Sequence, residues 1–217
     1  MSIQPQKTPT VVPNPLMAQE DENILVVKRQ DLFCAEGEYS AWQGLKTVDF
    51  GAYLNTIAEK KEYNPRSKME ADENYKQIIP YLIFQFEDKY FLMQRQAKAS
   101  EKRLQSKYSL GIGGHIREED VASSDVVAWS KREFEEEVNY SGSYTVEPLG
   151  ILNDDSNSVG KVHVGFVLIL KGDSSKISVN SELKSGELLT LEECEKFYDH
   201  MESWTQIAFN FIKSMNK

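Results

Sequence analysis

The chain has 217 residues, of which 40% are apolar, so it can bury a core of ordinary size in a single domain. Its formal net charge of −9 excludes an extended face for duplex nucleic acid, because neutralising phosphates requires clustered lysines and arginines. The longest apolar run, Phe166 to Leu170, is too short to span a membrane, and the N-terminus has no secretory pattern. The sequence therefore predicts a cytoplasmic protein without membrane or duplex nucleic-acid partners.

Three segments of different character are expected along the chain. Residues 1–22 contain four prolines and few large apolar residues, which is typical of a flexible tail. Residues 23–74 are expected to form an N-terminal extension, with a strand at Ile24–Arg29 and a helix that begins at Asp49 and leads into a charged connector. Residues 75–217 are expected to form the main domain.

The main domain is predicted to start with two strands joined by a tight turn. The run QIIPYLIFQFEDKYFLMQRQ contains two apolar stretches separated by three charged residues, which is the pattern of a hairpin. Pro80 lies inside the first stretch and indicates an edge position or a bulge, because proline cannot donate to a sheet. A further strand is predicted at Val162–Leu170.

Two helices are predicted near the C-terminus. Thr190 with Glu193, and Ser203 with Gln206, have the spacing of capping boxes that start helices. Behind the second start, an apolar stripe is expected to face the core; it consists of Trp204, Ala208, Phe211 and Met215. The order of elements predicts an α/β (α+β) fold, in which helices flank a mixed sheet.

An acidic helix is the most informative segment. Ser124 or Asp125 can cap a helix that runs to Val138, and Val127, Phe134 and Val138 share the stripe expected to face the core. Glu133, Glu136 and Glu137 lie together on a different face. Three such carboxylates repel one another, so they indicate either a solvated surface paired with Lys131 and Arg132 or a site for a hard cation such as Mg²⁺.

The sequence around these glutamates resembles the Nudix box. That pattern is a Gly, five residues, a Glu, seven residues, and then Arg-Glu-apolar-any-Glu-Glu-any-Gly-apolar. The segment Arg132–Val138 fills the second half in order, and Gly114 fits the leading glycine. The chain departs from the pattern at Asp120, which replaces the first Glu, in the eleven residues between Asp120 and Arg132, and at Asn139, which replaces the last Gly.

The resemblance covers about residues 75–212 and extends to bacterial Nudix-like proteins described as phosphoesterases. It implies a pyrophosphatase-type hydrolase that cuts a phosphoanhydride bond in a small-molecule diphosphate, such as a nucleoside diphosphate derivative. In this interpretation Glu133, Glu136 and Glu137 hold Mg²⁺ or Mn²⁺, and Arg132 orients them. Arg95, Gly114 and His115 are the candidate substrate-binding residues. The sequence leaves open whether the protein is a homodimer.

Two alternatives to the hydrolase remain at this stage. A relative of isopentenyl-diphosphate isomerases would be expected to carry a cysteine before the Gly-His turn, but Leu110–His115 contains none. A non-catalytic Nudix-fold module that binds a nucleotide or a protein is the second alternative. Metal binding separates it from the hydrolase, because a pure binding module need not retain the metal ligands.

For several further residues, the sequence suggests an ordinary structural role as well as a functional one. Cys34 and Cys194 show neither disulfide nor metal-ligand spacing and are expected to be inert packing residues. Arg103 and Lys107 are expected either to contact phosphate or to be exposed charges, and Trp42 and Trp129 either to stack on a base or to pack in the core. His163 is expected to pack within its strand, and the turn NDDSNSVG is a candidate wall of the pocket.

Overall fold

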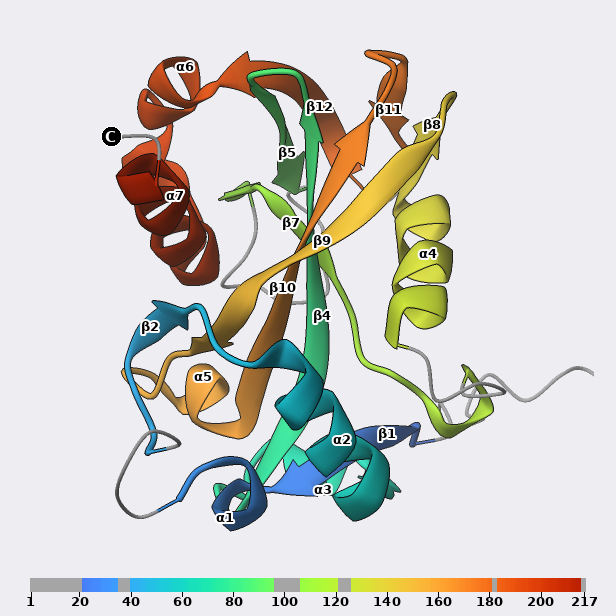
Figure 1. Cartoon of the computed structure of the whole chain (residues 1–217), viewed down its shortest axis with the longest axis vertical. Helices are drawn as coiled ribbons and strands as arrows, with labels where there is room; N and C mark the ends of the chain where they lie inside the picture. Colours follow the sequence, from blue (N-terminus) through green and yellow to red (C-terminus); the bar gives the residue numbers. More distant parts are fainter. Residues whose placement is uncertain (1–20, 35–39, 96–105, 121–125, 181–182, 216–217) are drawn as a thin grey trace, which may run out of the picture.

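The computed structural model describes residues 21–34, 40–95, 106–120, 126–180 and 183–215 (Figure 1). Within these ranges the side chains of residues 120 and 126–129 are also left undescribed. Some sequence expectations therefore lie outside the described residues: nearly all of the predicted tail, Arg103, the helix caps Ser124 and Asp125, and the side chains of Asp120, Val127 and Trp129.

Strands and helices alternate irregularly along the described chain. The strands are β1 (Asn23–Lys28), β2 (Gly44–Lys46), β3 (Glu62–Pro65), β4 (Tyr75–Phe86), β5 (Lys89–Arg95), β6 (Tyr108–Ser109), β7 (Gly111–Gly113), β8 (Val138–Tyr140), β9 (Tyr144–Asn153), β10 (His163–Gly172), β11 (Ile177–Val179) and β12 (Leu183–Thr190). The helices are α1 (Arg29–Leu32), α2 (Phe50–Lys60), α3 (Arg66–Met69), α4 (Val126–Glu137), α5 (Ser158–Val162), α6 (Leu191–Glu195) and α7 (Ser203–Met215), with short 3₁₀ helices η2 (Glu118–Asp120) and η3 (Tyr198–His200). None of the helices in the described part of the chain is long and apolar enough to cross a membrane.

Most of the described strands join one mixed sheet, as predicted. Its continuous order is β12-β5-β4-β10-β9-β2, and β1, β3, β6 and β7 attach beside this path. The central strands β4 and β10 run parallel, whereas β5 pairs antiparallel with β4, and β9 pairs antiparallel with β10. Strands β8 and β11 form a separate small sheet. The predicted hairpin is the β4–β5 pair.

The two faces of the central strands are covered by different helices (Figure 1). Leu82 and Phe84 of β4 pack in one cluster with Phe134 of α4, whereas Tyr81 and Ile83 pack in another cluster with Phe209 of α7. Neighbouring side chains of a strand point to opposite faces, so a strand buried on both sides needs an unbroken apolar run. This requirement explains why the sequence of β4 shows no polar alternation.

The N-terminal extension packs on one end of the same sheet. Strand β1 pairs with β4 and with β3, and Tyr53 and Ile57 of α2 join a cluster that includes Phe166 of β10. The predicted helix start is confirmed, because the Asp49 side chain accepts a hydrogen bond from Ala52 N. The expectation of an irregular charged connector was wrong: β3 and α3 lie there, because pairing with β1 overrides the weak local signal.

Pro80 does not mark an edge strand, because β4 is central. On one side of β4 lies β10; on the other, pairing with β1 ends at Gln77 and pairing with β7 begins at Tyr81. Pro80 therefore falls in the interval between two partner strands. A residue without a backbone N–H is tolerated there because neither partner strand pairs with it.

The C-terminal helices follow the prediction in part. The capping box of Thr190 and Glu193 is confirmed, but the Gln206 amide donates to Tyr198 O at 2.8 Å instead of closing a second box. The buried residues of α7 are Thr205, Ala208, Phe209 and Ile212. The expected stripe is confirmed at Ala208, which is buried, and at Trp204, which packs against the core, but it was wrong at Met215, which is 62% exposed. Apolar residues occupy two adjacent stripes of this helix, so spacing alone did not select the buried one.

The two cysteines differ in environment. Cys194 is fully buried, and burial raises the pKa of its thiol to about 12, which fits the expected inert packing role. Cys34 is exposed, so the same expectation was wrong for it. Its neighbours Leu32 and Phe33 provide the buried apolar contacts of that turn instead.

Candidate active site

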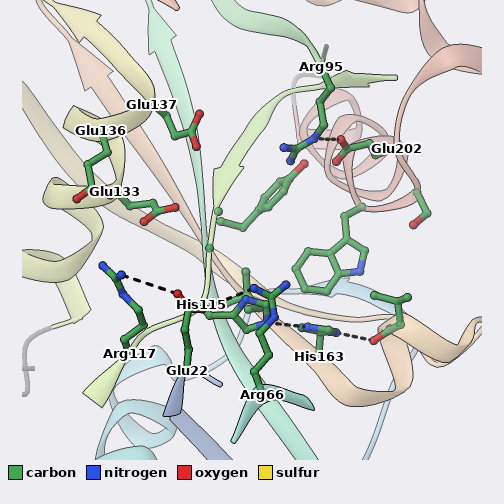
Figure 2. Close-up of a pocket in the computed structure, with 18 of the residues that line it drawn as sticks. Glu22, Arg66, Arg95, His115, Arg117, Glu133, Glu136, Glu137, His163 and Glu202 are labelled. Carbon is green, nitrogen blue, oxygen red and sulfur yellow. Dashed lines mark hydrogen bonds and ion pairs between the residues drawn. The ribbon is translucent and has the colours of Figure 1, made fainter. Parts of the chain in front are cut away.

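One pocket of about 500 Å³ opens where the acidic helix, the glycine-rich turn, the middle of β4 and the start of β10 meet (Figure 2). Its size falls within the range of small-molecule sites, roughly 300 to 1,000 Å³. Its polar lining includes Glu22, Arg66, Arg95, His115, Arg117, Arg132, Glu133, Glu136, Glu137, Asn157, His163 and Glu202.

The acidic wall of this pocket is presented by α4. Phe134 is 1% exposed and stacks on Phe84 with ring centroids 5.8 Å apart, which fixes the rotation of the helix on the sheet. Glu133, Glu136 and Glu137 then line the pocket, and their carboxylates point in different directions (Figure 2). The sequence prediction that these glutamates share a face away from the core agrees with this arrangement.

The carboxylates differ in exposure and share one positive charge. The Glu133 side chain is 14% exposed, whereas that of Glu136 is 57% exposed. Arg132 Nη1 donates to Glu136 Oε1 at 2.6 Å, and Arg132 Nη2 lies 3.8 Å from Glu133 Oε2. The donor set consists of oxygen atoms that carry negative charge, which is the chemistry that Mg²⁺ and Mn²⁺ prefer. The donor chemistry of the acidic wall therefore suits a hard divalent cation.

Gly114 lies directly against Glu133. A Cβ built on Gly114 would lie 2.3 Å from Glu133 Oε1 and 2.9 Å from its carboxyl carbon. A side chain at position 114 would therefore displace the Glu133 carboxylate from its place against the turn. This contact explains physically why a glycine at this distance accompanies the acidic helix.

Gly114→Ala is expected to lower any activity of this site by up to about 100-fold, because the displaced Glu133 carboxylate would move by roughly an ångström. The free energy of unfolding should change by only about 1 kcal/mol, since the clashing atom is the end of a flexible side chain. Gly51→Ala in α2, where a Cβ has ordinary space, is the matched control. Turnover and chemical denaturation measure the two effects. Full activity in Gly114→Ala protein would show that the contact is not needed.

The wall opposite the acidic helix carries arginines paired with carboxylates. Arg95 Nε donates to Glu202 Oε1 at 2.5 Å, which joins the end of β5 to the residue before α7. Burial alone would lower the pKa of Arg95, but the Glu202 carboxylate outweighs it and the pKa is raised. Arg66 and Arg117 lie 3.7 and 3.9 Å from the two oxygens of Glu22. The pocket thus has positive groups facing its acidic wall.

Two histidines meet at the floor of the pocket. His115 Nε2 lies 2.7 Å from Gln77 Oε1 and 3.2 Å from His163 Nε2. Burial, the nearby Arg66 and His163 together lower the pKa of His115 to about 3, so this ring stays neutral. The expectation that His163 serves only strand packing was incomplete, because the residue also lines the pocket.

A buried lysine anchors the turn beside this pocket. Lys76 is fully buried, and its Nζ donates to Asp155 Oδ1 at 2.9 Å, Gly160 O at 2.8 Å and His163 O at 3.1 Å. Burial lowers the pKa of Lys76 to about 8, against the opposing effect of Asp155. Asp155 also pairs with Arg29. These bonds fix the turn from Asn153 to Val162 against β4, and no local sequence signal indicated this network.

The pairing of Asp155 predicts acid sensitivity. Burial alone would raise the pKa of Asp155, but hydrogen bonds from Arg29, Lys76 and Asn153 outweigh it, and the pKa lies well below the ordinary 3.8. Below about pH 4 the unfolded chain therefore binds a proton that the folded chain does not, so stability falls with pH, by at most ~1.4 kcal/mol per unit. Asp155→Asn should be less stable at pH 7 but should lose less stability between pH 5 and 3.

Denaturant unfolding across that pH range measures the difference. The matched control is Asp199→Asn at an exposed position, which should keep the slope of the native chain. Equal slopes in the native and Asp155→Asn chains would contradict the assignment.

The remaining sequence candidates separate into those inside and those outside the pocket. From the turn NDDSNSVG, the residues Asn157, Val159 and Gly160 line it, so the structure selects the pocket role that the sequence offered only as the lesser alternative. Trp42 packs edge-on against Phe33 and Tyr53 in the core, so its expected base-stacking alternative is not supported. Lys107 lies near the glycine turn but is not among the residues that line this pocket.

The fold and the site define a class of protein. A mixed sheet lies between two helical layers, and a glycine turn abuts an Arg-Glu-x-x-Glu-Glu helix over one pocket, which is the arrangement that the Nudix resemblance implied. Comparison with known proteins supports this assignment. No family model matches the chain.

Individual proteins do match over nearly the whole chain. Protein YmaB of Bacillus subtilis (strain 168) is 34% identical over 208 residues, covering 91% of this chain and 100% of YmaB. The crystal structure of Tm1382, which is assigned to the Nudix hydrolases, is 33% identical, with a TM-score of 0.76 over 89% of this chain and 100% of that one. The chain belongs to the Nudix family.

A more distant likeness concerns the fold alone. The Nudix domain of Shewanella oneidensis NrtR, whose structure was determined with ADP ribose, is 12% identical and has a TM-score of 0.52. The match covers 65% of this chain and 89% of that domain. The fold is therefore shared over 65% of this chain although little of the sequence is.

Proposed function

We propose that this protein is a divalent-metal-dependent hydrolase that cuts a phosphoanhydride bond in a nucleoside diphosphate derivative or a related diphosphate. The observation that carries the proposal is the acidic wall: three carboxylates of one face of α4 line a pocket of about 500 Å³, and Gly114 is placed against one of them. Membership of the Nudix family supports a hydrolase of the pyrophosphatase type.

The side chains of the acidic wall have distinct roles in this proposal. A Mg²⁺ or Mn²⁺ ion held by Glu133, Glu136 and Glu137 would neutralise diphosphate charge and lower the pKa of a bound water. Arg132, which bonds Glu136 and lies close to Glu133, keeps these carboxylates oriented. One of the three glutamates serves as the general base that accepts the proton of the attacking water.

The opposite wall provides the binding groups. Arg95 is held by Glu202 and can meet the negative charge of a diphosphate across the pocket from the glutamates. Gly114 and His115 form the edge that faces the substrate. Trp204 also lines the pocket and packs edge-on against Tyr81 at 5.8 Å, so it offers a fixed aromatic surface for a base. The substrate is therefore expected to be a small molecule that combines a diphosphate with a flat group.

The alternatives are less well supported. Neither cysteine lines the pocket, because Cys194 is buried in the core near α6 and Cys34 is exposed near α1, so an isomerase that uses a cysteine finds no support. A binding module remains the competing function. Its distinguishing property is ligand binding without metal-dependent turnover.

The test is a panel of diphosphates assayed with Mg²⁺, with Mn²⁺ and with a chelator. ADP ribose, nucleoside triphosphates, nucleotide sugars, dinucleoside polyphosphates and isopentenyl diphosphate cover the substrate classes, and released phosphate or mononucleotide is measured. Cleavage that requires the metal supports the proposal. Measurable binding of panel members with no cleavage under any metal would overturn the hydrolase in favour of the binding module.

A further inference from the structure

We propose that His115, His163 and Glu70 form a second cation site in this molecule, selective for a borderline metal such as Zn²⁺ over Mg²⁺. Each of the three residues offers one ligand atom, and these atoms all lie within 4.8 Å of one another. Its ligands differ from those of the acidic wall, because none of its three residues belongs to α4. It adds a metal chemistry that the hydrolase proposal does not require.

The separation of the two rings matches the geometry of a shared metal. Their Nε2 atoms are 3.2 Å apart. Two imidazole nitrogens that bind one tetrahedral Zn²⁺ at about 2.0 to 2.1 Å would lie about 3.4 Å from each other. The rings are tilted by 57° with centroids 5.4 Å apart, so the contact is made by nitrogen atoms and not by stacked faces. The two side chains are therefore already near the spacing that ligation needs.

His163 is held in the tautomer that a ligand requires. Its Nδ1 lies 2.7 Å from Val159 O, and because a carbonyl can only accept, Nδ1 must be the protonated nitrogen. The lone pair of Nε2 is then directed toward His115. Metal-binding histidines are commonly oriented in this way by a backbone carbonyl on the other nitrogen. The carbonyl comes from α5, so the turn anchored by Lys76 sets the direction of this ligand.

His115 can join by moving one proton. The amide of Gln77 donates to Met69 O at 3.1 Å, which turns its oxygen toward His115 and places the proton of that ring on Nε2. A cation that takes the place of this proton leaves the ring neutral, with the proton transferred to Nδ1. Gln77 Oε1 then lies beside the ion as an additional oxygen donor.

Glu70 supplies the negative charge. Its carboxylate is exposed and pairs with Arg66, whose Nε lies 3.2 Å from Oε1. An exposed pair of this kind contributes little to stability, so the carboxylate can exchange partners at small cost. Two imidazoles and one carboxylate form a donor set typical of Zn²⁺, whereas Mg²⁺ strongly prefers oxygen. The pocket would then hold two cations of different kinds.

Calorimetric titration of Zn²⁺ into the full chain tests the site. The chain carries Glu133→Gln and Glu136→Gln so that the acidic wall does not contribute. One Zn²⁺ per chain is expected, and a large excess of Mg²⁺ should not displace it. His115→Asn and His163→Asn should each weaken binding by more than the roughly 10- to 100-fold that loss of a supporting partner costs. Glu70→Gln should weaken it several-fold.

The third histidine of the chain is the matched control. His200 is exposed, so His200→Asn should leave Zn²⁺ affinity unchanged. Nuclear magnetic resonance of the imidazole nitrogens in the chain with all three histidines intact makes the result independent of variant folding. Zn²⁺ should shift the signals of two histidines and leave the third unmoved.

Three results would overturn the site. They are absence of Zn²⁺ binding in the double variant, displacement of Zn²⁺ by Mg²⁺, and unchanged affinity after the substitution of His163. In each case the two histidines would form only a hydrogen-bonded pair. Because the readout is binding of the metal alone, such a failure would leave the proposed hydrolase activity untouched.

Discussion

A chain carrying Glu136→Gln is expected to fold normally and to lose metal-dependent turnover by about 100-fold or more. The Glu136 side chain is 57% exposed and its ion-pair partner Arg132 lies on the same helix, so loss of the charge should cost little stability. A metal ion contributes several kcal/mol to stabilising a transition state, and each 1.36 kcal/mol corresponds to a factor of ten in rate. Removing one charged ligand therefore has a large kinetic and a small structural effect.

Glu135→Gln is the matched control for this substitution. Glu135 lies on the same turn of α4 but is exposed and pairs with Lys131 at 3.8 Å, away from the pocket. Turnover of the substrate found in the diphosphate panel and thermal unfolding are measured for both variants. If Glu136→Gln retains native turnover, or if Glu135→Gln loses as much, the assignment of the acidic wall as the metal site is wrong.

Lys76→Met is expected to produce the largest loss of stability, about 3 to 5 kcal/mol. The buried ammonium group satisfies Asp155 and two backbone carbonyls at once. Without the ammonium group, the carbonyls of Gly160 and His163 lose a buried donor at roughly 1 to 3 kcal/mol each, and Asp155 keeps only one of its two cationic partners. Arg29 still pairs with Asp155 in the variant, so the chain should remain folded at room temperature.

The control for Lys76→Met is Lys161→Met. Lys161 pairs with Glu73 at 3.2 Å, and both side chains are largely exposed, so a change of less than about 1 kcal/mol is expected. Chemical denaturation of both variants gives the comparison. A loss below about 1 kcal/mol in Lys76→Met would mean that Arg29 and the turn itself hold Asp155 without the lysine.

The sequence revealed those parts of the site that are close together along the chain. Glu133, Glu136 and Glu137 occupy neighbouring turns of one helix, so their common face follows from helical spacing. Gly114 was found by resemblance, and its physical role emerged only from its contact with Glu133. Local spacing therefore identified one wall of the pocket.

The other walls depend on contacts between distant segments. Glu202 reaches Arg95 because α7 lies beside the end of β5, and Glu22 reaches Arg117 across the N-terminal extension. Arg95 was a candidate from the sequence, but nothing near Glu202, Glu22 or Arg117 in the sequence distinguishes them from ordinary surface charge. Lys76 was even harder to identify from the sequence, because a lysine is expected at the surface. It is fully buried because three acceptors that are distant in the sequence take up its hydrogen bonds.

The sheet, like the site, was predictable from the sequence only in part. Continuous apolar runs identified β4 and β10, but they could not show that the two strands run parallel or that β7 and β1 share one side of β4. Likewise, α7 was predicted as a helix, whereas its buried face depended on the sheet against which it packs. The local sequence pattern therefore predicts whether a segment is a helix or a strand, whereas tertiary packing determines which elements lie next to each other.

The parallel pairing of β4 with β10 has a consequence for the order in which the molecule forms. His163 pairs with Gln77 and Lys171 with Gln85, and the entire glycine turn and acidic helix lie between these strands in the sequence. The chain must lose the conformational entropy of this long loop before the two strands make contact. Such pairings therefore form slowly. A nascent chain that ends before residue 163 would contain the Nudix box and yet leave the apolar edge of β4 uncovered. The histidine pair and the lysine anchor would therefore assemble only after the acidic helix has been synthesised.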